Sequence, residues 1–261
     1  MDMHRYISLA QDLFALALVA AFPLIDLPAM RRLKRFSSSA ARLAVYRRSV
    51  ISTWLCTIVA IVLAPLTTLL VVPRHAGDLP WLDGRSMLLA ALTALIALLF
   101  AWILWPSIQC AFDHATRKKY LKAYQASFVR GMLPVSRDER LWWVLLSVTA
   151  GVCEELLYRG FLLQFLRGHL AGGLALGLTL AWLVSSLAFG IAHIYQGVHG
   201  VVETTAAGLV FGLVAILTGS LIVPIMLHCL IDLRLLLIYH PAEDAPEFAD
   251  VLVSGFDPSV R

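Results

Sequence analysis

Long apolar runs alternate with short polar segments along most of this chain of 261 residues. A helix needs about 20 consecutive apolar residues to cross a bilayer. The candidate spans are the runs 7–30, 50–72, 86–112, 141–166, 171–194, 201–218 and 221–239. The pattern predicts an all-α fold: a polytopic membrane helix bundle with about seven (six to eight) transmembrane helices.

The first apolar run is too long for a cleaved signal peptide, and it carries Asp12 and Asp26. We therefore expect a retained helix. No internal repeat or long linker divides the chain. We expect residues 1–240 to form a single transmembrane domain, in which residues 145–236 hold the polar motifs. Residues 241–261 are expected to form a short polar tail.

Composition agrees with a membrane protein. The chain is 60% hydrophobic and 15% charged, whereas soluble domains are about 45–50% apolar and about 25% charged. The net charge of +4 does not indicate nucleic-acid binding, because the basic residues gather in two loops, 31–48 and 117–140. Cytoplasmic loops are enriched in Lys and Arg. Both basic loops should thus face the cytoplasm and contact lipid headgroups, with loop 73–85 and the N-terminus outside and the tail inside.

Charged side chains at membrane depth single out one stretch. Glu154, Glu155 and Arg159 lie within six residues of apolar sequence, and each costs about 2.5–3.5 kcal/mol to insert. Glu155 and Arg159 are four apart and share a helix face, so they can pair. Glu154 points about 100° away. Because an apolar setting disfavours a charged carboxylate, Glu154 is a candidate general base.

Two further apolar segments add histidines. Phe189 and His193 share one face, as do His228 and Asp232. In one scheme Glu154, His193 and His228 bind a zinc ion that carries the reacting water. In the other, Glu154 and His193 hold the water directly, while His228 and Asp232 stabilise the oxyanion. Both schemes describe amide hydrolysis, and spacing does not choose between them; one divalent metal ion and a metal-independent mechanism are equally compatible.

Other interpretations compete with catalysis. Each motif alone is compatible with a structural ion pair or a hydrogen-bonded core histidine, but their joint occurrence in successive spans favours a site. A proton relay in a transporter would also use such residues, although here they lie in one half of the chain. A non-catalytic binding or immunity protein is the other alternative. We expect Glu203 to face the membrane interface.

The four cysteines, Cys56, Cys110, Cys153 and Cys229, lie in or beside apolar segments. They are expected to be small buried hydrophobes, not disulfides. Cys153 and Cys229 adjoin the polar motifs, but a neighbour on a helix is turned about 100° away. A cysteine nucleophile is therefore disfavoured. Gly208 and Gly212 form a GxxxG pattern, which permits close helix packing.

These motifs resemble those of the CPBP family, which includes the CAAX proteases and bacteriocin-processing (Abi) enzymes. The family pattern is Glu-Glu-x-x-x-Arg, Phe-x-x-x-His and His-x-x-x-Asn/Asp, matched here from Glu154, Phe189 and His228 over about residues 145–236. The resemblance implies an intramembrane endopeptidase of a membrane-associated protein or peptide, in a bacterial inner membrane. It implies that Glu154 activates water, His193 assists, and His228 and Asp232 stabilise the transition state. The family has been described both as metalloproteases and as metal-independent glutamate proteases.

Overall fold

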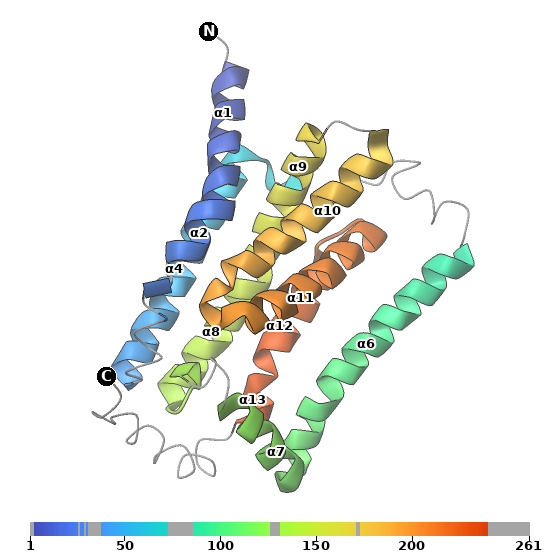
Figure 1. The fold of residues 1–261 in the computed structure, drawn as a ribbon. Coiled ribbons are helices and arrows are strands. Elements are labelled where there is room, and N and C mark those ends of the chain that lie inside the picture. Colours follow the sequence, from blue (N-terminus) through green and yellow to red (C-terminus); the bar gives the residue numbers. More distant parts are fainter. Residues whose placement is uncertain are drawn as a thin grey trace.

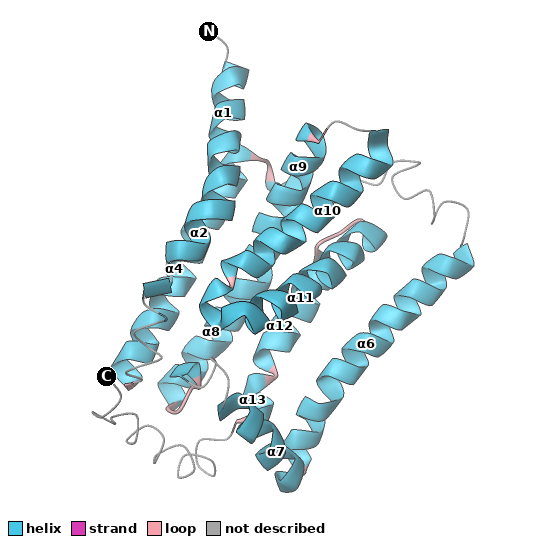
Figure 2. Ribbon diagram, viewed as in Figure 1, coloured by secondary structure: helices cyan, strands magenta, loops and turns pink. Residues whose placement is uncertain are grey.

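The computed structural model describes residues 3–25, 27–28, 30, 38–72, 86–125, 131–170 and 173–239 (Figure 1). Loop 73–85, residues 31–37, Asp26 and the tail 241–261 lie outside the described residues. Within the described part the regular elements are helices, apart from an isolated bridge between Val71 and Ser220 (Figure 2). The predicted all-α class is confirmed.

Each of the seven predicted spans overlaps a helix. Five are long and apolar enough to cross a membrane: Tyr6–Ile25, Ser39–Leu63, Ala90–Phe112, Arg137–His169 and Ile194–Thr218. The other two are shorter: α10 (Gly173–Ala192) and α12 (Ile222–Leu233). At 1.5 Å per residue, α12 spans about 18 Å, less than the roughly 30 Å core of a bilayer. The chain is thus a polytopic helical membrane protein with helices of unequal length.

The helices and turns that form these spans and connect them have the following bounds. Most of the first span is α1 (Met3–Leu16), a π-helical turn (Ala17–Ala21) and α2 (Phe22–Ile25). The others, in chain order, are α4 (Ser39–Leu63), α5 (Leu66–Leu69), α6 (Ser86–Phe112), α7 (His114–Gln125), α8 (Arg137–Glu155), the π-helical turn η3 (Leu156–Leu162), α9 (Leu163–His169), the 3₁₀ turn η4 (Ile194–Gln196), α11 (Gly197–Thr218) and α13 (Leu235–Ile238).

The second predicted span was placed too late in the chain. Helix α4 begins at Ser39, where the Ser38 hydroxyl accepts the Ala41 N–H at 3.2 Å as an N-cap. It ends at Leu63, before Pro65. The described part of the basic segment 31–48 is therefore largely helix, and Arg42 is buried in a bidentate ion pair with Glu139, at 2.9 and 3.0 Å. A partner in the bundle, rather than a lipid headgroup, satisfies this arginine.

Contacts of the basic residues show how the helix ends are grouped. The Arg42–Glu139 pair joins the start of α4 to the start of α8. Arg140 donates to the carbonyls of Tyr239 (2.9 Å) and Leu236 (3.2 Å) at the end of α13. The described parts of both basic segments and the end of α13 therefore lie at one end of the bundle (Figure 1). We call it the basic end.

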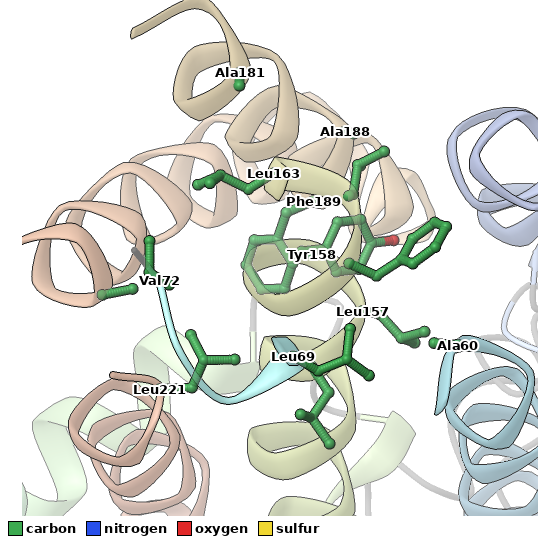
Figure 3. Packing of buried hydrophobic residues seen from close by; sticks show 14 of the residues in the cluster. Ala60, Leu69, Val72, Leu157, Tyr158, Leu163, Ala181, Ala188, Phe189 and Leu221 are labelled. Carbon is green, nitrogen blue, oxygen red and sulfur yellow. The ribbon is translucent and has the colours of Figure 1, made fainter. Parts of the chain in front are cut away.

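At the opposite end, the segment after α4 folds back into the bundle. Leu69 and Val72 are buried. The N–H of Val72 donates to the Gly219 carbonyl (3.1 Å), and the N–H of Leu221 donates to the Leu70 carbonyl (3.0 Å). Figure 3 shows Leu69, Val72 and Leu221 with Leu157 and Tyr158 of η3 in the main apolar core. Backbone hydrogen bonds therefore tie the connection after α4 to the loop between α11 and α12.

Glycines allow α10 and α11 to pack closely. A Cβ atom at Gly190 would overlap the Thr205 side chain and lie 2.8 Å from the Val201 carbonyl oxygen. At Gly212 it would lie 2.6 Å from the Trp182 ring. Small residues at such positions let membrane helices approach each other. The close contact brings the Phe189 face of α10 against α11.

We expect Gly190→Ala to destabilise the protein by about 1–3 kcal/mol, because the added methyl group overpacks the α10–α11 contact. The measurement is the thermal or denaturant unfolding of the purified protein in detergent. Gly168→Ala is the matched control, since no atom lies within 4 Å of its added Cβ. Equal unfolding of both variants would contradict the close-packing role of Gly190.

Candidate active site

The first part of the site lies where α8 passes into η3. Glu154 and Glu155 end α8, and Arg159 lies in the π-helical turn that follows. Glu155 and Arg159 are fully buried, whereas the Glu154 side chain is 18% exposed. A π turn departs from the regular helix and often occurs at functional sites. The sequence pattern predicted only a continuous helix here.

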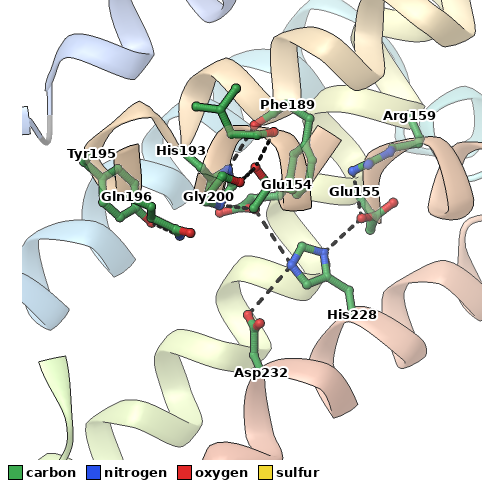
Figure 4. Close-up of polar contacts among 12 residues, drawn as sticks. Glu154, Glu155, Arg159, Phe189, His193, Tyr195, Gln196, Gly200, His228 and Asp232 are labelled. Atoms are coloured by element: carbon green, nitrogen blue, oxygen red, sulfur yellow. Dashed lines mark hydrogen bonds and ion pairs between the residues drawn. The ribbon is translucent and has the colours of Figure 1, made fainter. Parts of the chain in front are cut away.

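Glu155 has two partners. Its Oε1 accepts from Arg159 Nη1 at 2.8 Å and lies 2.9 Å from Nδ1 of His228 on α12 (Figure 4). A carboxylate beside Nδ1 holds the proton on that nitrogen. The predicted Glu155–Arg159 pairing is present, but Glu155 also orients a histidine from another helix. This second contact was not predicted.

Arg159 is held by α10 and α11. Its guanidinium lies 4.3 Å from the centroid of the Phe189 ring, and Nη2 donates to the Gly208 carbonyl at 3.3 Å. A Cβ at Gly208 would lie 3.2 Å from both Arg159 Nη2 and the Phe189 ring. Gly208 therefore leaves room for the buried cation, and Phe189 covers it.

Two imidazoles face the Glu154 carboxylate (Figure 4). His193, at the end of α10, donates from Nδ1 to the Phe189 carbonyl at 2.9 Å, and its Nε2 lies 4.0 Å from Glu154 Oε2. His228 Nε2 lies 3.9 Å from the same oxygen and 3.7 Å from Asp232 Oδ2. The structure thus brings the candidates Glu154, His193, His228 and Asp232 together around one point.

These separations bear on whether a small molecule could lie between the side chains. Direct hydrogen bonds to nitrogen measure about 2.7–3.2 Å, so atoms 3.7–4.0 Å apart are not in direct contact, and a small rearrangement would admit a bridging water. Asp232, 34% exposed, and Glu154, 18% exposed, place the cluster at an open face of the bundle. A water molecule here would touch one carboxylate and two imidazoles, which is an arrangement able to activate it.

The donor types would also suit a divalent metal ion, but their spacing does not. Zinc bonds of about 2.1 Å at a tetrahedral angle place neighbouring ligand atoms about 3.4 Å apart. The Glu154–His193 and Glu154–His228 separations are 4.0 and 3.9 Å. Among the described residues no group of three or more His, Cys, Asp or Glu is placed to hold a metal ion. As arranged, these residues do not fit zinc ligation.

Residues outside the three motifs complete the site. Phe211 of α11 stacks on the His228 ring at 5.1 Å between centroids and 18° between planes. Tyr158 packs edge-on against Phe189. Neither was predicted. Phe211 could have been noticed in the sequence because it follows Gly208 by three residues and is the only Phe, Tyr or Trp of α11.

Two other sequence expectations concern residues near the site. Glu203 does not join it: its side chain is 67% exposed and lies 3.3 Å from His199 Nδ1. The four cysteines, all in the described part of the chain, form no disulfide, as expected, with Cys110 and Cys153 buried and Cys56 and Cys229 partly buried. Cys229 packs where α12 crosses Gly151 of α8.

Comparison with known proteins adds one finding. Residues 136–234 match a family model described as type II CAAX prenyl endopeptidase, Rce1-like. Neither the curated proteins nor the solved structures gave a match. The matched segment runs from the cap of α8 through α12 and contains Glu154, Glu155, Arg159, Phe189, His193, His228 and Asp232.

Proposed function

We propose that this chain is an intramembrane endopeptidase in which Glu154 is the general base, because residues 136–234 match the family model of Rce1-like type II CAAX prenyl endopeptidases. The observation that carries the proposal is the convergence of both histidine Nε2 atoms on the Glu154 carboxylate. The test compares protein N-termini in membranes that contain the wild-type protein or Glu154→Gln.

In the proposed first step, Glu154 takes a proton from the bound water as the water oxygen bonds to the scissile carbonyl carbon. The carbonyl electrons move onto oxygen and give a tetrahedral oxyanion. His228, protonated at Nδ1 by its contact with Glu155, donates from Nε2 to this oxyanion when both ring nitrogens carry protons. Asp232, beside the same Nε2, supports that proton.

In the second step, the proton on Glu154 passes to the amide nitrogen, with His193 assisting. The C–N bond then breaks and the oxyanion collapses to a carboxylic acid. His193 is fixed for this role by its Nδ1 bond to the Phe189 carbonyl, which leaves Nε2 facing Glu154. Glu155, Arg159 and Phe189 hold the reacting groups in place and do not exchange protons.

The proposed substrate is a membrane-associated protein or peptide. We propose that the basic end, including segments 31–48 and 117–140, faces the cytoplasm of a bacterial inner membrane, by the enrichment of Lys and Arg in cytoplasmic loops. Residues 1–240 would form the single membrane domain and residues 241–261 the tail. Non-catalytic binding and proton-coupled transport become the preferred functions if cleavage fails the test.

Removal of metal ions by a chelator distinguishes the zinc scheme from the metal-independent scheme. We expect EDTA and 1,10-phenanthroline to leave cleavage unchanged, because the separations of Glu154 from both histidines exceed the spacing of zinc ligands. Cleavage is measured on a peptide spanning the cut site found in the N-terminal comparison, and metal content by mass spectrometry of the purified protein. Stoichiometric zinc together with loss of cleavage on chelation, restored by added zinc, would instead establish the metal scheme.

A further inference from the structure

Three aromatic rings from three helices form a continuous stack that ends on a site histidine. Phe100 of α6 stacks on Phe211 of α11, with centroids 6.1 Å apart and planes 15° apart. Phe211 in turn stacks on His228 of α12 at 5.1 Å and 18°. Both phenylalanines are buried. The stack reaches from α6, outside the family match, into the site.

The environment of the His228 ring shows what the stack can do. One face of the ring lies against Phe211, while Phe189 meets it at 87° with centroids 5.9 Å apart. Parallel stacking restricts rotation of the imidazole about its Cβ–Cγ bond. Rotation out of the stacked plane would move Nδ1 away from Glu155 and Nε2 away from Glu154 and Asp232.

We propose that Phe211, backed by Phe100, is a positioning residue that fixes the plane of the His228 imidazole, so that Nδ1 meets Glu155 and Nε2 faces Glu154 and Asp232. The inference rests on the proposed function only for its effect on cleavage. The ring geometry stands independently of it. In this arrangement α11, which carries none of the three motifs, holds two site side chains: Arg159 through Gly208 and His228 through Phe211.

The effect of losing the stack is moderate and specific. Aromatic pairs are stabilised beyond their burial by an amount equivalent to about a twofold to tenfold change in an equilibrium. Phe211→Leu keeps an apolar side chain but removes the flat face, so orientations of the His228 ring that are tilted out of the stacked plane should rise about twofold to tenfold in population. Phe211→Tyr keeps the ring and should restore the wild-type arrangement.

The test is ¹⁵N NMR of the full chain labelled at histidine, in lipid nanodiscs without substrate. His228→Gln identifies the His228 signals. Wild type and Phe211→Tyr should show one protonated Nδ1 signal, whereas Phe211→Leu and Phe211→Met should show exchange between ring states. Phe161→Leu is the matched control, because Phe161 is equally buried but contacts Phe14 and Phe165.

Both Phe211→Leu and Phe211→Met are made, so that one can be measured if the other does not fold. Circular dichroism reports the fold of each. An unchanged His228 spectrum in a folded Phe211 variant would overturn the positioning role. The wild-type-specific N-termini should fall by about twofold to tenfold in Phe211→Leu and return in Phe211→Tyr. If the NMR change occurs while no variant or wild type yields new termini, the positioning role stands and the proposed proteolysis fails.

Discussion

Cells that make Glu154→Gln should lack the new protein N-termini that the wild-type protein generates in the same membranes. Glutamine keeps the shape of the side chain but cannot accept the proton of the attacking water. Removing a general base lowers a rate by about 10²–10⁴-fold. The side chain is partly exposed, so its replacement by a side chain of the same shape should leave the fold intact. N-terminal proteomics of washed membranes measures the outcome and names the cut site.

Glu203→Gln is the matched control for this experiment. It makes the same chemical change on α11, at a carboxylate that is largely exposed and pairs with His199 away from the cluster. Membranes with Glu203→Gln should show the same protein N-termini as membranes with the wild type. An identical set of protein N-termini in membranes with wild type and with Glu154→Gln would refute proteolysis and favour binding or transport. The two proteins must be present at equal levels, and cells that lack the chain give the background.

Arg159→Met should be the most destabilising single substitution in the site. Arg159 donates to Glu155, and both side chains are fully buried. Removing one partner of a buried ion pair typically costs about 3–5 kcal/mol, because the other charge is left without compensation. The expected result is a large loss of folded protein, measured by thermal unfolding in detergent and by yield.

The double variant Arg159→Met/Glu155→Gln should recover part of this stability, since it removes both charges together. It should not recover cleavage, because glutamine cannot hold His228 as the carboxylate does. Arg137→Met, at the exposed start of α8, controls for loss of a cation in general. Wild-type stability of Arg159→Met would show that Glu155 does not carry a buried charge.

Contacts within one helix could be predicted from the sequence, and contacts between helices largely could not. The spacing of Glu155 and Arg159 predicts their pairing on one face, and the structure has it. The Glu155–His228 contact depends on how α12 crosses α8, where Gly151 allows close approach to Cys229. Nothing in the spacing of either motif sets that crossing.

Helix boundaries, likewise, could be predicted from the sequence only in part. Long apolar runs indicated the seven spans, but α7 was not predicted because its residues lie largely in the basic segment 117–140, which was expected to be a loop. The start of α4 at Ser39 was missed because the seven basic residues in 31–48 were also expected to lie in a loop. Buried pairing with Glu139, 97 residues away, is what permits Arg42 to lie in the helix. The N-cap by Ser38 was not predicted. The stacking of Phe211 on His228 likewise depends on tertiary packing.

The backbone joint between residues 70–72 and 219–221 has an evolutionary consequence. Its two hydrogen bonds run from amide to carbonyl, so they do not depend on any polar side chain. The positions are constrained in other ways: Gly219 has a positive φ of 69°, which side chains disfavour, and Val72 and Leu221 are buried. Homologous proteins that keep this joint should therefore have glycine at the position of Gly219 and apolar residues at the positions of Val72 and Leu221.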